Sequence, residues 1–395
     1  MKKCEDVLSD NKTVMMFMSQ DSFFISHFKQ RTSVAIDRGY KIYLLADKTS
    51  EEFTNEIKQA GIKFIDSKIN RSSVNIFKEI ASLLRTIRVI KKYKPCLIHN
   101  YGAKSIFYGT IACKLVSRKT KIVNNLVGLG YAYTVKTFKA RILKKIINTG
   151  YKMFLNPKGS RVICENGDDL RYFKKEKAIR DGNSYLIPGA GVDLEKFKPC
   201  PWEEKEKKIT AVICTRLLHS KGVEIFAEAS IKLKKKEVPI QMWIVGDIDH
   251  SNPDSLSRED IRKIEKENCC KILGYQNNVD EILKRCHIAV LLSKREGLPL
   301  SLIEAAATGL CIVTSDVVGC RDLVSNGNGV LIKSTDPEEV VYVLENLARN
   351  TERIRYMGIK SRELACKKYG YKYIGEQIIK VYEELIEKNE NNPCN

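Results

Sequence analysis

The sequence predicts an α/β protein with two doubly wound domains, and three observations lead to this prediction. The chain has 395 residues, which is enough to bury two hydrophobic cores. Short apolar runs alternate with longer helical patterns in the first half of the chain, and the same alternation resumes after residue 208. Such alternation is typical of parallel sheets with helices on both faces. We place the domains at residues 1–195 and 196–370, and we treat residues 371–395 as a final helix and tail.

In the first half, six apolar runs are expected to form strands. These strands lie at residues 13–18, 41–45, 62–65, 97–99, 121–123 and 161–164, with helices at 25–38, 74–93, 104–117 and 136–155. Ligands bind beyond the carboxyl ends of parallel strands, so the loops that follow these strands are candidate sites. One of them begins at His99, which could move a proton, although a lone histidine at a strand end is more often structural. Another contains the flexible turn Gly128 to Gly130.

The net charge of +20 is concentrated in the first half of the chain. Residues 1–200 hold 38 Lys and Arg against 18 Asp and Glu, whereas residues 201–395 hold 30 of each kind. No acidic residue lies between Glu79 and Glu165. A one-sided basic domain indicates an anionic partner, which could be a membrane leaflet, a nucleic acid or a polyanionic substrate.

Residues 136–155 have the pattern of a basic amphipathic helix. Phe138, Ile142 and Ile146 recur at helical spacing, and basic residues are interleaved with them. A helix of this kind is suited to lie on anionic lipid, although a core helix with a solvated basic face would have the same pattern. The residues predicted to contact the membrane are Lys136, Lys139, Arg141, Lys144 and Lys145.

Other features exclude several classes of protein. The 13 cysteines are odd in number and scattered, and they form no C-x-x-C pair, so we expect reduced thiols and no zinc site. No apolar run approaches the roughly 20 residues of a membrane span, and residues 1–10 are too polar for a signal peptide. We expect a cytoplasmic protein that is peripheral at the inner face of the cell membrane. A nucleic-acid-binding protein is the weaker alternative, because the aromatic residues of the basic half lie mostly in apolar, core-like runs.

The second half begins a new series of strands and helices. We expect strands at residues 209–214, 240–245, 288–292, 311–314 and 327–332, and helices at 300–308, 338–349, 352–369 and 373–387. The strand 288–292 leads into a loop with Gly297 and then into a helix that follows Pro299. Free N–H groups and the helix dipole make such a helix start an anion site.

Charged side chains lie around that anion site. Glu296 is in the loop, and Glu304 lies on the helix, where it could accept hydrogen bonds from a ribose diol or could simply be solvated. Arg216 and Lys221 follow the strand 209–214 and together could bind a diphosphate. Alone this basic pair is a weak signal, because surface Arg and Lys are common in this chain.

Glu296 and Glu304 resemble the E-x7-E signature of the family 4 retaining glycosyltransferases. The flanking residues 305–309 and 312–316 strengthen this resemblance, and residues 215–222 resemble the family's G-R-L-x-x-x-K-G with Thr215 in place of the first glycine. The resemblance extends over residues 13–388 and is strongest for the bacterial members that extend undecaprenyl-diphosphate-linked sugars. It implies the GT-B fold, in which two Rossmann-like domains face a cleft and the last helix crosses back to the first domain.

The resemblance also implies roles for individual residues. Glu296 would lie by the donor sugar, while Arg216 and Lys221 would hold the donor diphosphate as the catalytic cations. The other donor-binding residues implied are Gly246, Leu273, Gly297, Leu298, Pro299, Leu300 and Glu304. Many members of the family have a histidine just before the glycine turn, and this histidine faces the donor sugar. This chain has Val127 at that position, so we assign no catalytic histidine. His99, Gly128 and Gly130 remain candidates for the sugar side of the site.

The expected reaction is retaining transfer of a hexose or N-acetylhexosamine from a UDP-sugar to an undecaprenyl-diphosphate-linked saccharide. We expect no metal or other cofactor, because a basic clamp can replace a metal. In the family, the leaving phosphate is thought to take the proton of the acceptor hydroxyl. The alternative enzyme is a UDP-sugar epimerase of the same fold, which would need no acceptor.

Overall fold

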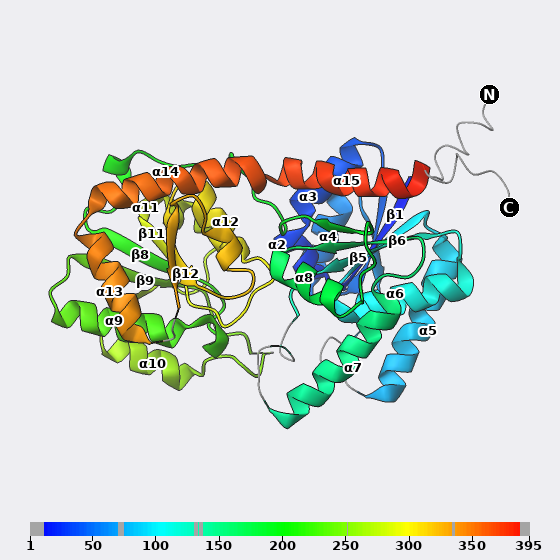
Figure 1. The fold of residues 1–395 in the computed structure, drawn as a ribbon, viewed down its shortest axis with the longest axis horizontal. Helices are drawn as coiled ribbons and strands as arrows, with labels where there is room; N and C mark the ends of the chain where they lie inside the picture. The colour runs from blue at the N-terminus through cyan, green and yellow to red at the C-terminus, as the bar shows by residue number, and fades with distance from the viewer. Residues whose placement is uncertain are drawn as a thin grey trace. The chain divides into compact units, whose positions relative to one another are not determined.

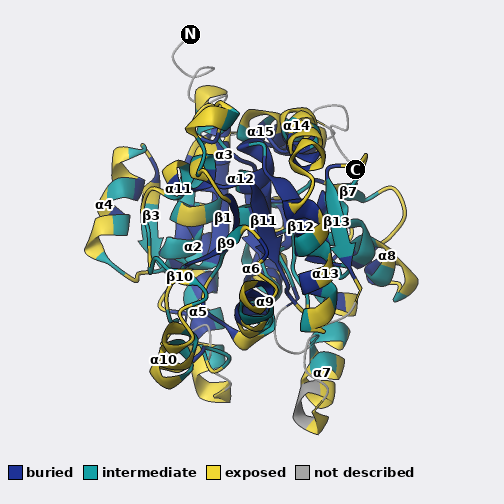
Figure 2. Cartoon of the chain, turned by 90° about the vertical axis from the view of Figure 1, so that its left-hand side faces the viewer, coloured by how far each residue is buried: buried dark blue, intermediate teal, exposed yellow. Residues whose placement is uncertain are grey.

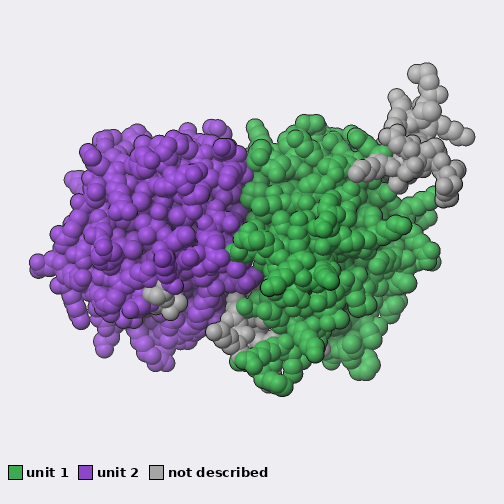
Figure 3. Space-filling view, in the orientation of Figure 1, with its two compact units in different colours: residues 1–191, 371–395 green, residues 192–370 purple. Residues whose placement is uncertain are grey.

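The computed structural model describes residues 12–69, 75–129, 133, 137–250, 252–333 and 336–387. The chain divides into two compact units, which are shown in different colours in Figure 3. Unit 1 comprises residues 1–191 and 371–395, and unit 2 comprises residues 192–370. Each unit contains one parallel sheet with helices packed on it, so the prediction of two parallel α/β domains is confirmed (Figure 1).

Unit 1 is built on a seven-stranded parallel sheet with the order β3-β2-β1-β4-β5-β6-β7. Its strands are β1 (Thr13–Gln20), β2 (Lys41–Asp47), β3 (Lys63–Asp66), β4 (Leu97–Tyr101), β5 (Lys121–Leu126), β6 (Ser160–Cys164) and β7 (Ser184–Leu186). Its helices are α2 (Asp21–His27), α3 (Lys29–Asp37), α4 (Glu51–Gln59), α5 (Ile76–Tyr93), α6 (Ala103–Val116), α7 (Phe138–Phe154), α8 (Gly167–Lys175) and α15 (Tyr371–Glu387). The last helix, α15, packs on α3 within this unit.

Unit 2 repeats the same topology with a six-stranded parallel sheet of order β10-β9-β8-β11-β12-β13. Its strands are β8 (Ile209–Cys214), β9 (Ile240–Val245), β10 (Lys271–Ile272), β11 (Ile288–Leu291), β12 (Cys311–Ser315) and β13 (Gly329–Ile332). Its helices are α9 (Val223–Lys235), α10 (Arg258–Lys266), α11 (Val279–Arg285), α12 (Leu300–Ala307), α13 (Pro337–Ala348) and α14 (Thr351–Lys368). In both sheets the strand order reverses direction at one point, and ligands bind at such points in open α/β sheets.

The central strands form because their apolar runs are buried on both faces. In β1, Val14, Met15 and Phe17 are fully buried, and β11 and β12 of unit 2 are buried along their whole length. Strands of this kind need helices on both sides of the sheet. Figure 2 shows the result, with dark blue strands inside and helices whose outer faces are exposed.

Some predicted boundaries were wrong. The helix expected at 25–38 is two helices, α2 and α3, which meet at Phe28. α2 already begins at Asp21, whose carboxylate accepts hydrogen bonds from the N–H groups of Ser22 and Thr49 and thereby ties the helix start to the loop after β2. The strands β7 and β10 and the helices α4, α8, α10 and α11 were not predicted. Among the described residues, no helix combines the length and the apolar character that a membrane span requires.

Candidate active site

The predicted catalytic residues lie at the point where the sheet of unit 2 reverses its strand order. β8 pairs with β11 there, although β9 and β10 separate them in the sequence. Arg216 and Lys221 are in the loop that follows β8, and Glu296 is in the loop that follows β11. The carboxyl ends of these two strands meet at one edge of the sheet, so the topology brings together residues that lie 75 positions apart.

The Lys221 ammonium forms an ion pair with the Glu296 carboxylate. Only 17% of the Lys221 side chain and 12% of the Glu296 side chain are exposed. Ser293 Oγ donates a hydrogen bond of 2.5 Å to Glu296 Oε1. The two loops are also joined by their backbones, because the Lys294 N–H donates to the Ser220 carbonyl at 2.9 Å. Glu296 and Lys221 are therefore held in position before any donor binds.

Glycines allow the loops of this site to approach each other closely. Gly222 has φ +73°, and a Cβ at this position would lie 2.5 Å from the carbonyl oxygen of Leu292. Gly246, after β9, has φ +139°, and a Cβ there would lie 1.8 Å from the carbonyl oxygen of Thr215. Both contacts are with backbone, which cannot turn away as a flexible side chain can. Gly246 therefore fixes the loop that carries Arg216, and its role in donor binding stays a prediction.

Replacing Gly246 with alanine is expected to destabilise unit 2 by about 3–5 kcal/mol, through the clash with Thr215 and the strained backbone. Thermal unfolding measures this change. Gly274→Ala is the matched control, because Gly274 also has positive φ, +65°, but a Cβ there has nothing within 4 Å. Equal loss of stability in the two variants would contradict the account of the close approach at Gly246.

Arg216 forms an ion pair with a carboxylate of the same unit. Its Nη1 lies 2.7 Å from Asp249 Oδ2, and about half of its side chain is exposed. Arg216 and Lys221 are thus each paired with a different carboxylate. A bound diphosphate would compete with Asp249 for the guanidinium of Arg216, which has five N–H donors and can serve two acceptors.

The helix α12 begins directly after the Glu296 loop. Pro299 is the N-cap residue, with φ −71° and ψ 112°, so the helix follows it as expected, and no side chain caps the helix. The first N–H groups of a helix have no partner within it, and together with the helix dipole they attract an anion. Gly297, Leu298 and Leu300 lie at this helix start, next to Glu296 in the chain, and their role as donor-binding residues stays a prediction. Leu273, after β10, packs against the core of this unit, and its N–H donates to the Ile244 carbonyl.

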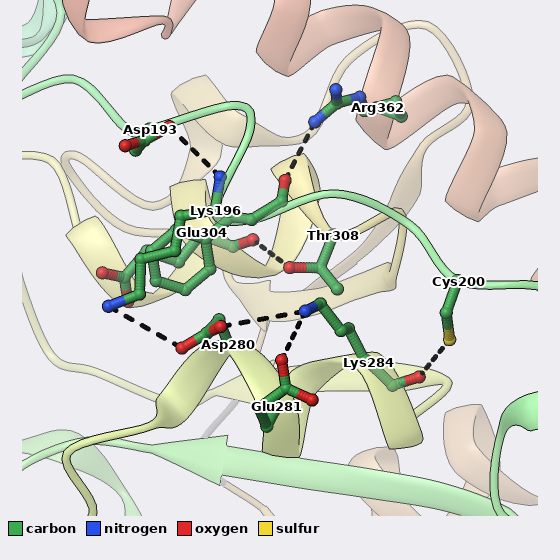
Figure 4. A network of polar contacts seen from close by, with 10 residues as sticks. Asp193, Lys196, Cys200, Asp280, Glu281, Lys284, Glu304, Thr308 and Arg362 are labelled. Carbon is green, nitrogen blue, oxygen red and sulfur yellow. Dashed lines mark hydrogen bonds and ion pairs between the residues drawn. The ribbon is translucent and has the colours of Figure 1, made fainter.

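Glu304, on the second turn of α12, is half-buried beside a cluster of charged residues (Figure 4). The carboxylate of Asp280 in α11 forms ion pairs with two lysines. Its Oδ1 lies 3.7 Å from Lys196 Nζ, and its Oδ2 lies 3.8 Å from Lys284 Nζ. Among the described residues, none donates a hydrogen bond to the carboxylate of Glu304. Burial, opposed by Lys196 and aided by a smaller effect of Asp280, raises the pKa of Glu304 to about 7. Glu304 is thus not a plain solvated residue, and its free carboxylate is suited to accept hydrogen bonds from two hydroxyls.

The raised pKa of Glu304 predicts how donor binding depends on pH. The resemblance implies that Glu304 binds the donor ribose, and only an ionised carboxylate can accept hydrogen bonds from both ribose hydroxyls. The ionised fraction of Glu304 rises as the pH rises through about 7. The KM for a UDP-sugar is therefore expected to increase about tenfold from pH 8 to pH 6. In Glu304→Gln the KM should be high at every pH, whereas Glu281→Gln, on the exposed face of α11, should keep the wild-type profile. An unchanged profile in Glu304→Gln would show that another group titrates.

In unit 1, the prediction that His99 takes part in the sugar site was wrong. His99 lies within β4 and is 0% exposed. Its Nδ1 lies 2.7 Å from the Tyr382 hydroxyl of α15 and 3.0 Å from the Tyr101 hydroxyl. Burial, with a smaller effect of Arg31, holds the pKa of His99 well below its usual value. A neutral, enclosed histidine that joins α15 to the sheet is structural.

The structure describes only some of the other unit 1 residues that were predicted to contact the sugar or the membrane. Gly128 lies in the loop after β5 with φ +57°. Gly130 and Lys136 lie outside the described residues, and so does the side chain of Lys139. Arg141 and Lys145 of α7 are exposed. The side chain of Lys144 lies over two aromatic rings, with its Nζ 4.9 Å from the centroid of Tyr133 and 5.6 Å from that of Tyr172.

Sequence reasoning missed a buried polar cluster at the carboxyl ends of β5 and β6. The Asn125 amide donates to Glu165 Oε1 at 3.2 Å, and burial raises the pKa of Glu165 to about 7. Arg31 is buried nearby, and its Nη1 donates to the Gly189 carbonyl at 2.6 Å. These residues come from separate elements and form no sequence motif, so no local signal could have found them.

Comparison with known proteins agrees with this geometry. The model of the glycosyl transferases group 1 matches residues 195–364, and that of the glycosyl transferase 4-like family matches residues 13–166. The chain is 26% identical to N,N'-diacetylbacillosaminyl-diphospho-undecaprenol alpha-1,3-N-acetylgalactosaminyltransferase of Campylobacter jejuni subsp. jejuni, over 94% of this chain and 98% of that protein. It is 28% identical to UDP-Gal:alpha-D-GlcNAc-diphosphoundecaprenol alpha-1,3-galactosyltransferase of Escherichia coli, over 69% of this chain and 71% of that protein.

Solved structures show the same fold. Sucrose-phosphate synthase from Thermosynechococcus elongatus superposes with a TM-score of 0.78 at 17% identity, covering 95% of this chain and 100% of that one. Anabaena Alr3699/HepE in complex with UDP-glucose superposes with a TM-score of 0.74 at 16% identity, covering 94% and 99%.

Proposed function

Because the chain belongs to the glycosyl transferases of group 1, with a 4-like first domain, we propose that it moves a hexose or N-acetylhexosamine from a UDP-sugar to an undecaprenyl-diphosphate-linked saccharide. The names of two relatives support this substrate class, since both describe transferases that act on diphospho-undecaprenol-linked sugars. The observation that carries the proposal is the Lys221–Glu296 pair beside the start of α12. It puts a cation, a carboxylate and free helix N–H groups at one place.

In this proposal, the cations of the site stabilise the leaving diphosphate. Negative charge builds up on UDP as the bond to the sugar breaks, and preorganised positive groups stabilise that charge most in the transition state. Lys221 and Arg216 supply two positive charges, and the N-terminus of α12 adds its dipole. The restrained position of Lys221 against Glu296 lowers the cost of reorganisation during the reaction.

The carboxylates hold the rest of the donor. Glu296 accepts hydrogen bonds from hydroxyls of the donor sugar, and Glu304 accepts them from the ribose. The sugar is transferred with retention at its anomeric carbon, and the leaving phosphate takes the proton of the acceptor hydroxyl. No side chain of unit 1 is then needed as a base, which agrees with the burial of His99.

The acceptor is lipid-linked, so we place the enzyme at the cytoplasmic face of the membrane. The exposed Arg141 and Lys145 of α7 support contact with an anionic surface. Contact through the surface of unit 1 is the form of attachment we propose.

A transfer assay with purified protein tests the function. A panel of labelled UDP-sugars is incubated with undecaprenyl-diphosphate-linked saccharide, and the lipid is extracted with butanol. We expect one donor to label the lipid, with no label when the acceptor is omitted. Conversion of a UDP-sugar to its epimer without acceptor would instead support the epimerase.

The same assay tests independence of metal. Because Arg216 and Lys221 provide the positive charge, EDTA is expected to leave the transfer rate unchanged. Loss of activity in EDTA that Mg²⁺ or Mn²⁺ restores would contradict this part of the proposal.

A further inference from the structure

The backbone of Ser220, the residue directly before Lys221, is held on both sides. Its N–H donates to Asp254 Oδ2 at 3.0 Å, and its carbonyl accepts a hydrogen bond from the Lys294 N–H at 2.9 Å. Asp254 lies in the segment after β9, and Lys294 lies in the loop after β11. Three loops at the carboxyl edge of the sheet therefore meet at one residue, next to the cation of the Lys221–Glu296 pair.

The contact with Asp254 is part of a longer pairing between two loops. Leu218 and Ser255 form an antiparallel bridge between them. Beside the bridge, the His219 N–H donates to the carbonyl of Asp254 at 3.0 Å. The loop after β8 is thus paired with the segment 247–256 through backbone hydrogen bonds and is not a free surface loop.

A tight turn presents the Asp254 carboxylate to this pairing. The turn has the sequence Asn252-Pro253-Asp254-Ser255, and the Ser255 N–H closes it by donating to the Asn252 carbonyl at 3.0 Å. The Asp254 N–H donates to Asn252 Oδ1 at 3.0 Å. Asparagine at the first position and proline at the second favour such a turn. The turn is therefore specified locally, and it determines where the carboxylate lies.

The carboxylate of Asp254 supplies an acceptor that the loop of Lys221 lacks. Lys221 ends the short 3₁₀ turn His219–Lys221, and the N-cap residue of this turn, Leu218, has no side chain that could cap it. The first N–H groups of a helical turn have no partner within it. Because Asp254 accepts one of them from Ser220, it fixes the turn from which the Lys221 side chain extends. A small displacement of a catalytic group costs much reaction rate even where it costs little stability.

The same segment also reaches the second cation of the site. Asp249 Oδ2 lies 2.7 Å from Arg216 Nη1. The Asp249 N–H donates to Ser255 Oγ at 3.0 Å, so the pairing of the two loops holds this aspartate as well. The segment 247–256 therefore contacts the loop of Lys221 and the side chain of Arg216 through two separate aspartates.

We propose that Asp254 is a positioning residue for sugar transfer, which holds the turn of Lys221 so that the ammonium group meets the leaving diphosphate. This inference rests on the proposed function, because the charge that Lys221 stabilises is that of the departing UDP. Asp254 acts as a hydrogen-bond acceptor for Ser220, and its negative charge is not required. An aspartate that bound a metal ion would need that charge, which gives the experiment a second reading.

A double-mutant cycle with Lys221 tests the role of Asp254. UDP carries the charge that Lys221 stabilises, so its affinity is measured by calorimetric titration for the wild type, Asp254→Ala, Lys221→Met and the double variant. Asp254→Ala is expected to weaken UDP binding about tenfold in the wild type but less than about twofold in Lys221→Met, because it acts through that lysine. Equal weakening in the two backgrounds would overturn the proposal.

The conservative variant Asp254→Asn separates the hydrogen bond from the charge. Its amide oxygen can still accept from the Ser220 N–H, so UDP affinity and kcat should stay within about threefold of the wild type. A loss in Asp254→Asn as large as that in Asp254→Ala would show that the charge is needed, and the proposal would be wrong. If Asp254→Ala does not fold, Asn252→Ala replaces it in the cycle. That variant only loosens the turn, so it should give a smaller loss that again disappears in Lys221→Met.

Ser257→Ala is the matched control in the same segment of the chain. Ser257 Oγ accepts a hydrogen bond from the Asp260 N–H at 3.2 Å and thereby caps α10. Its replacement should lower thermal stability but leave UDP affinity unchanged. A loss of UDP affinity in Ser257→Ala like that in Asp254→Ala would show that any loosening of this segment has the same effect.

The transfer assay separates this inference from the proposed function. With an active donor, Asp254→Ala should lower kcat about tenfold and raise the KM less, since the charge on UDP is greatest as it leaves. A wild type that binds UDP but transfers no sugar would refute the proposed function, and the cycle with UDP would still decide whether Asp254 acts through Lys221. A wild type that binds no UDP would overturn both.

Discussion

Replacing Lys221 with methionine is expected to lower kcat for sugar transfer by about 10²–10³-fold. This is the usual effect of removing one preorganised group that stabilises developing negative charge. Lys221 is largely enclosed and faces Glu296 at the switch point of unit 2, so water cannot fully replace its charge. The KM for the donor should change less than kcat, because the diphosphate gains most of its charge in the transition state. Initial rates over a range of donor concentrations measure both constants.

Two controls separate catalysis from folding. Lys294→Met removes an exposed lysine from the neighbouring loop and should leave kcat unchanged. Lys221→Met leaves the Glu296 carboxylate without its cation, which is expected to lower stability. The double variant Lys221→Met/Glu296→Gln removes both charges, so it should regain stability but not activity. If Lys221→Met loses no more activity than Lys294→Met, Lys221 does not stabilise the leaving group.

Replacing Glu296 with alanine is expected to lower kcat/KM for the UDP-sugar by about 10²-fold, because the hydroxyls of the donor sugar lose the carboxylate that orients them. The affinity for UDP itself should remain or increase. UDP has no transferable sugar, and Lys221 is freed from its ion pair with Glu296. Calorimetric titration with UDP, together with initial rates for the UDP-sugar, measures this opposite response.

Ser293→Ala provides a milder test of the same site. It removes the hydroxyl that donates to Glu296 Oε1 but keeps the carboxylate, so we expect a loss of about tenfold or less. A parallel fall in UDP affinity and sugar transfer in Glu296→Ala would contradict the division of roles, because it would show that Glu296 acts through the fold of the loop.

The sequence predicted the strand, loop and helix around Glu296 well because their signals are local. The strand before Glu296, the loop glycine and the helix after Pro299 follow one another in the chain, and each has a recognisable pattern. The sequence could not indicate that Lys221 pairs with Glu296 or that Arg216 pairs with Asp249, since these contacts join loops that come together only in the folded sheet.

The errors in unit 1 have a different physical cause. His99 was interpreted as a residue at a strand end. Its partner Tyr382, however, lies 283 residues away in the sequence, on α15, and this contact helps to bury His99. The amphipathic pattern of α5 does not tell which of its apolar residues pack on the sheet and which remain exposed. Only the structure separates buried Ile90 from exposed Phe77 and Ile80.

The most direct test of the account is the stoichiometry of one reaction. UDP release and label in the lipid phase are followed together for the active donor, with wild type and Glu296→Ala. The account predicts one UDP released for each sugar transferred to the undecaprenyl-diphosphate-linked saccharide, little release without acceptor, and loss of both signals in the variant. Release of UDP with no label in the lipid, in the presence of acceptor, would show a hydrolase and contradict glycosyl transfer.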